Sequence, residues 1–143
     1  MARRFPLAGL LRLRHTEQDR AAASLAAANE RVRDAADARI AARRSLADSE
    51  DVRPIEDAAT LSAVAAARAA TRGMLEELDA VVQSRRADAD RAQEAYGAAR
   101  RAAVGLEKLE GKHAEQQAAE ELRAEQGALD EIAARRRTEG GSR

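Results

Sequence analysis

The stretch Asp51-Val52-Arg53-Pro54 decides the fold, because it is the one place after Pro6 where a long run of helix-forming residues is clearly interrupted. Pro54 lacks a backbone N–H and restricts Arg53 to extended geometry, so a helix arriving from the N-terminal side should stop there. A second helix can begin at the proline, with Glu56 and Asp57 near the positive end of its dipole. We predict a helix over about 7–49, a turn over about 50–54, a second helix over about 55–137 and a frayed tail over 138–143.

Composition excludes a thick globular core. The chain has 143 residues, of which 38 are alanine, and only 26 are larger apolar residues. Alanine, arginine and glutamate favour helices, so this composition suits long helices in close contact. We therefore predict an all-α fold, a long antiparallel two-helix coiled coil (a helical hairpin) whose second helix is longer than its first, as a single domain over residues 1–143.

A seven-residue repeat of apolar positions supports the coiled coil. Steps of seven from Leu11 and from Arg14 give one large and one small position in the first helix, and steps from Leu61 and Val64 continue the pattern in the second. Reflection about residue 53 brings Leu46 near Leu61, Val32 near Leu75, Leu25 near Val82 and Leu11 near Tyr96. The predicted seam consists of Leu11, Leu25, Val32, Leu46, Leu61, Leu75, Leu78 and Val82.

The far part of the second helix lacks a partner in this arrangement. The reflected first helix ends near Ala99, and the heptad phase slips between Gly105 and Gly111, where we expect a bend. Leucines on an unpaired helix expose apolar surface unless another protein covers them. We therefore predict partner-binding residues in the segment 106–137, namely Leu106, Leu109, Leu122, Leu129 and Ile132.

The sequence shows no catalytic, cofactor-binding or metal-binding constellation. There is no cysteine, and the two histidines, His15 and His113, stand in charged helical context as ordinary surface residues. The glycines are dispersed singly, which is unlike a phosphate-binding loop. We predict that the protein is not an enzyme and needs no cofactor.

Charge and hydropathy bound the possible partners. The formal net charge is zero, which argues against a nucleic-acid binder, although both ends of the chain are basic. The N-terminal leucines are too few and too interrupted by arginine for stable membrane insertion. They could start the hairpin seam, or they could form an amphipathic segment on an anionic membrane. We expect a cytoplasmic protein, either free in the cytoplasm or peripheral at the inner face of the cell membrane.

Two parts of the chain resemble a known family. The N-terminal part has Phe5-Pro6-Leu7, Leu10-Leu11-Arg12-Leu13-Arg14, Glu17 and Arg20. The C-terminal part has Glu107-Lys108-Leu109-Glu110, Lys112-His113, the run from Glu120 to Gln126 and Leu129-Asp130-Glu131-Ile132-Ala133. Together they resemble the FliJ family, the small coiled-coil component of the bacterial flagellar type III export apparatus.

The resemblance implies a non-enzymatic stalk of a protein export machine that serves flagellar biogenesis and motility. Its implied partners are the export ATPase hexamer, the export-gate membrane protein and the export chaperones that it helps to cycle. The alternative is a generic coiled-coil scaffold or membrane-surface adaptor unrelated to flagella.

Overall fold

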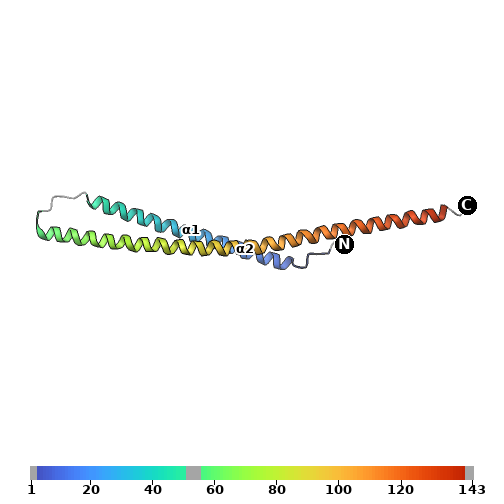
Figure 1. The fold of residues 1–143 in the computed structure, drawn as a ribbon, viewed down its shortest axis with the longest axis horizontal. Helices are drawn as coiled ribbons and strands as arrows, with labels where there is room; N and C mark the ends of the chain where they lie inside the picture. The colour runs from blue at the N-terminus through green and yellow to red at the C-terminus, as the bar shows by residue number, and fades with distance from the viewer. Residues whose placement is uncertain (1–2, 51–55, 141–143) are drawn as a thin grey trace. The chain divides into compact units, whose positions relative to one another are not determined.

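Two long helices make up the structure, a computed structural model that describes residues 3–50 and 56–140. Helix α1 spans Ala8–Glu50 and helix α2 spans Ala58–Gly140, and no strand occurs in these two ranges (Figure 1). The prediction of an all-α, antiparallel hairpin with a longer second helix is confirmed. The predicted turn lies outside the described residues except for Glu50, which ends α1.

The ends of the helices differ slightly from those predicted. Asp57 lies before α2 and caps it: the N–H of Thr60 donates to Asp57 Oδ1 at 2.6 Å. This backbone hydrogen bond holds the pKa of the Asp57 carboxyl below its usual value. At the other end, α2 includes Thr138 to Gly140, and residues 141–143 lie outside the described part of the chain. Gly105 and Gly111 lie within α2, which is continuous there.

The helices contribute to two compact units, which we describe separately. One unit contains the N-terminal residues through Glu17 together with the chain from Ala99 onward, and the other contains Gln18–Ala98. In each unit, a part of α2 lies beside a chain segment from the N-terminal third of the sequence.

In the unit Gln18–Ala98, one ion pair fixes how α1 and α2 are aligned. Arg39 Nη1 lies 3.0 Å from Asp79 Oδ1. Because both helices rise about 1.5 Å per residue, this contact sets Ala35 level with about residue 83 and Ala28 level with about residue 90. The buried residues of this unit agree with that alignment: they are Ala28, Ala35, Val82 and Ala89.

The predicted pairing about residue 53 is wrong by roughly three turns of helix. In the usual heptad letters, Leu11 begins position a and Arg14 position d in α1, while Leu61 begins a and Val64 begins d in α2. Antiparallel helices pack a residues of one helix beside d residues of the other. The reflection instead set Leu25 beside Val82, which both occupy a. The observed alignment sets the small d residues Ala28 and Ala35 level with the a residues Ala89 and Val82.

The predicted seam positions differ in how far they are buried. Leu11 and Val82 are buried, whereas Leu25, Val32, Leu46, Leu75 and Leu78 are half-buried. Leu61 is 53% exposed because α1 ends level with about residue 68 of α2, counted from the Arg39–Asp79 contact. The start of α2, drawn green in Figure 1, accordingly extends beyond the end of α1.

Two adjacent valines provide a direct test of this packing. Val82 is fully buried, whereas Val81 is 41% exposed. We expect Val82→Ala to lower the free energy of unfolding by about 1.5 kcal/mol, at about 0.8 kcal/mol per buried methylene. The matched control Val81→Ala should change it by less than about 0.5 kcal/mol. Chemical denaturation followed by circular dichroism measures both, and equal losses would show that Val82 does not lie on the seam.

Candidate functional site

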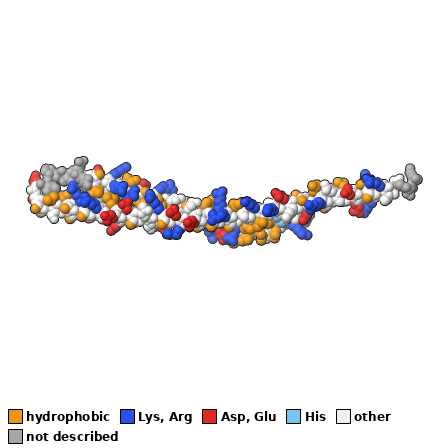
Figure 2. Space-filling model, viewed as in Figure 1, with side chains coloured by type: hydrophobic (Ala, Val, Ile, Leu, Met, Phe, Trp, Pro, Cys, Tyr) orange, Lys and Arg blue, Asp and Glu red, His pale blue; other side chains and the backbone are white. Residues whose placement is uncertain are grey.

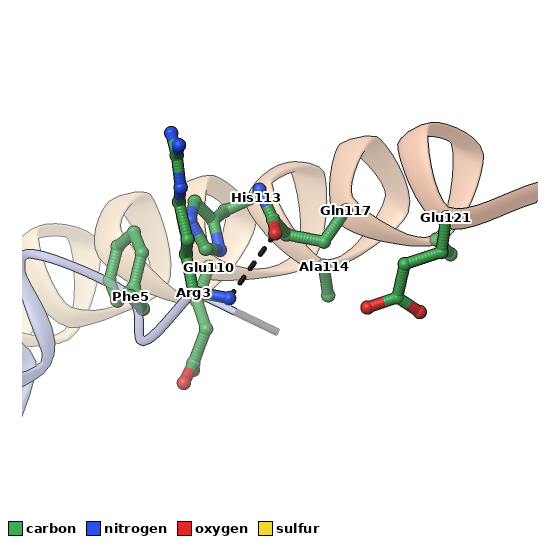
Figure 3. A pocket seen from close by; sticks show the side chains of 8 residues that line it. Arg3, Phe5, Glu110, His113, Ala114, Gln117 and Glu121 are labelled. Carbon is green, nitrogen blue, oxygen red and sulfur yellow. Dashed lines mark hydrogen bonds between the residues drawn. The ribbon is translucent and has the colours of Figure 1, made fainter. Parts of the chain in front are cut away.

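The N-terminal leader, which we define as residues 3–7, lies against α2. The Phe5 and His113 rings are 5.6 Å apart between centroids and inclined by 60°. The backbone N–H of Arg3 donates to Gln117 Oε1 at 3.2 Å. Figure 3 shows Arg3 and Phe5 approaching the helix from the leader, with His113 and Gln117 presented by successive turns of α2. The leader therefore continues the line of contacts that α1 makes with α2 in this unit.

A hollow of about 320 Å³ lies beside the leader. It is open to solvent and its lining carries charges of both signs, which is unlike the enclosed apolar pockets that hold small molecules. The lining residues are Arg3, Phe5, Glu110, His113, Ala114, Gln117, Ala118 and Glu121.

Both histidines make contacts that the sequence pattern did not reveal. His15 Nε2 lies 2.7 Å from Glu107 Oε1, across the two helices, and both side chains are about half exposed. Nearby, Arg14 Nη1 lies 2.8 Å from Glu17 Oε2, along α1. His15 and Glu107 both occupy heptad position e. Pairing a residues with d residues would have placed these two positions side by side from the sequence. The contact of His113 with Phe5 had no such signal, because the leader has no helical period.

The segment without an intramolecular partner is shorter than the predicted 106–137. His15 contacts Glu107, Phe5 contacts His113, and Arg3 contacts Gln117, so α2 has neighbours well beyond Leu106. The prediction failed because it followed from the incorrect pairing about residue 53 and because it left the leader unplaced.

The remaining unpaired part, residues 122–140, is called here the distal arm. Each of its residues is exposed. Leu122 is 56% exposed, Leu129 65% and Ile132 50%. Counted at 3.6 residues per turn from the seam position Ala103, Leu122, Leu129 and Ile132 lie at about 100°, 80° and 20° around the helix axis. The distal arm thus carries three exposed large apolar side chains.

The other two predicted partner-binding residues lie closer to α1. Leu106 is half-buried, and Leu109 is 47% exposed. In the same unit, Leu7, Leu10 and Leu13 are 38–50% exposed. Figure 2 shows hydrophobic side chains gathered where the N-terminal part of α1 lies. The structure therefore separates the five predicted residues into a pair near α1 and a trio on the distal arm.

The described residues contain no candidate metal-binding cluster. Within residues 3–50 and 56–140, no three His, Asp or Glu side chains lie where they could hold a metal ion together. None of the helices in these ranges has a stretch apolar enough and long enough to cross a membrane. Much of the helix surface, including all of residues 122–140, is exposed.

Comparison with known proteins decides the family. A family model described as "Flagellar FliJ protein" matches residues 3–141, nearly the whole chain. The chain belongs to this family. Proteins of the family are coiled-coil, non-catalytic components of the flagellar export apparatus, so the resemblance seen in the sequence is confirmed. Neither the curated proteins nor the solved structures gave a match.

The contact between the leader and α2 predicts protection from protease. We expect His113→Ala to remove the surface on which Phe5 packs and to speed tryptic cleavage after Arg3 and Arg4 several-fold, because cleavage follows the population of the undocked leader. Glu115→Ala, an exposed change two residues along α2, is the control. Mass spectrometry of timed digests measures the rates, and identical cleavage in both variants would mean that the leader is not held by His113.

Proposed function

We propose that this protein acts as a stalk at the export ATPase ring and as an escort for export chaperones, with the distal arm as its main protein contact. The observation that carries this proposal is the exposed apolar face of Leu122, Leu129 and Ile132 in a member of the flagellar FliJ family. Membership of the family points to the flagellar export apparatus, and the exposed face offers a surface on which a partner protein can dock.

Exposure on this scale favours a partner for the distal arm. Large apolar side chains that gather on one face of a helix are typical of recognition by a hydrophobic groove or a second helix. The three residues follow spacings of seven and three, which keeps them on one face. Because each residue of the distal arm is exposed, a partner can cover this face without displacing α1.

Charges along the distal arm complement this apolar face. Glu131 and Arg135 form an ion pair on the helix surface, and Arg136 and Arg137 follow. Exposed pairs of this kind add little stability, so their value lies in orienting an encounter with a charged partner. An apolar stripe with charged flanks suits docking on a protein ring.

Leu106 and Leu109 form a second candidate contact in this proposal. Their side chains lie near α1, where Leu10 and Leu13 add exposed apolar surface. We assign this surface to the export-gate membrane protein or to the export chaperones, the other partners that the family implies. The expected location is the cytoplasm, peripheral at the inner face of the cell membrane.

Removal of the distal arm tests the proposal. A chain ending at Glu121 keeps the contacts of Arg3, Phe5 and His15 with α2, so it should retain its hairpin. We expect it to lose binding to the purified export ATPase by at least about tenfold, or about 1.4 kcal/mol, since a few buried apolar anchors dominate most interfaces.

A full-length triple variant sharpens the test. Leu122→Glu, Leu129→Glu and Ile132→Glu together should weaken ATPase binding as much as the truncation does. The matched control places glutamate at Leu61, Met74 and Val81, which are 53%, 55% and 41% exposed in the other unit. Isothermal titration calorimetry measures the affinities. Wild-type affinity in the truncated chain or in the distal triple variant would contradict the proposed contact.

A further inference from the structure

Arg39 lies beside a column of charges on α2 that alternates in sign. The column has one residue per heptad at position e: Arg72, Asp79 and Arg86. Arg39 Nη1 bonds to the middle member at 3.0 Å, with 26% of the Arg39 side chain and 47% of the Asp79 side chain exposed. The one acidic member of this trio is therefore the one that Arg39 meets.

The apolar seam by itself does not select this alignment. A displacement of α1 by seven residues again sets a residues beside d residues, because the repeat is seven. Ala28 would then lie level with Val82 in place of Ala89. The alanines on the seam, Ala28, Ala35 and Ala89, are short, so they interlock weakly with the opposite helix and oppose such sliding little.

The charge column does distinguish the alignments. A displacement of one heptad in one direction brings Arg39 to Arg72, and a displacement in the other direction brings it to Arg86. Either displacement replaces an attraction with a repulsion between like charges, and repulsive alternatives of this kind are a common source of specificity. The Arg39–Asp79 ion pair thus favours the observed register over both of its neighbours.

The other unit shows the same arrangement at His15. This side chain contacts Glu107, and the residue one heptad earlier on α2 is Arg100. Displacement in that direction would exchange a carboxylate for a guanidinium. The same displacement would therefore also break the His15–Glu107 contact.

The start of α2 could receive α1 after such a displacement. Leu61 is 53% exposed and Val64 half-buried, since α1 ends level with about residue 68. Sliding by one heptad, about 10 Å, would bring Leu46 level with Val64. The seven residues that join the helices can span more than 20 Å when extended, so chain length permits both registers.

We propose that the Arg39–Asp79 ion pair selects the register of the hairpin, and that loss of this pair lets α1 slide one heptad along α2 toward Leu61. The hairpin then has two registers about 10 Å apart. A charged group of a binding partner that pairs with Arg39 or Asp79 breaks the ion pair between them. Partner binding is then coupled to movement of α1 along α2. This inference concerns the unit Gln18–Ala98 and does not depend on the function proposed for the distal arm.

Exchanging two charges on α2 tests the proposal. Arg72→Asp with Asp79→Arg keeps composition and net charge but moves the carboxylate one heptad toward Leu61. The chain has no cysteine, so a pair of introduced cysteines can report each register. Ala28→Cys with Ala89→Cys reports the observed one, and Ala28→Cys with Val82→Cys reports the displaced one. A disulfide needs Cα atoms within about 7 Å, so one register cannot form both.

We expect the parent chain to form the 28–89 disulfide and the exchanged variant to form the 28–82 disulfide, with at least a tenfold reversal in the ratio of initial oxidation rates. The control exchange Glu30→Arg with Arg44→Glu, at outward positions of α1, should behave as the parent. Asp79→Asn alone, which perturbs folding less, should raise the 28–82 rate in helical protein. Persistence of the 28–89 disulfide in the exchanged variant, or an unchanged 28–82 rate in Asp79→Asn, overturns the proposal.

Discussion

The close approach of α1 and α2 along alanine-lined positions is the contact on which this structure depends. Ala28, Ala35 and Ala89 are buried with Val82 in one unit, and Ala103 is buried with Leu11 in the other. Short side chains let the helix axes come near each other, so a thin two-helix structure can still exclude water from its centre. The same shortness makes the apolar interlock shallow, and charges such as Arg39 and Asp79 then gain influence over the alignment.

The unequal helix lengths determine which surfaces remain available. Helix α1 has 43 residues and α2 has 83, so about half of α2 cannot pair with α1. The leader extends the contacts as far as Gln117, and the beginning of α2 and the distal arm stay exposed. The chain belongs to the flagellar FliJ family, and we propose these exposed lengths as its contact surfaces. Among the described residues, no group of three or more His, Asp or Glu side chains could hold a metal ion beside them.

The sequence predicted the fold class and the heptad columns but not their alignment. Leu11, Ala28, Ala35, Val82, Ala89 and Ala103 are buried, and each stands in a predicted column, because periodicity is a local property. The pairing failed because it matched equivalent heptad positions, whereas antiparallel helices match a with d. The contacts of Phe5 and Arg3 with α2 were also missed, since a non-helical leader carries no period. The partner-binding role of Leu106, Leu109, Leu122, Leu129 and Ile132 stays a prediction, because the structure contains one chain.

Pulsed electron paramagnetic resonance, which measures the distance between two spin labels, tests the alignment of α1 and α2 most directly. Spin labels on cysteines at Glu30 and Ala66 occupy exposed, outward positions of α1 and α2 in the same unit. Alignment of a with d as observed separates them by about 31 Å along the axis and roughly 37 Å in total, for helices 8–10 Å apart. Pairing about residue 53 would give roughly 26 Å in total by the same geometry. A distribution centred near 37 Å is the predicted result, and one centred near 26 Å would contradict the alignment.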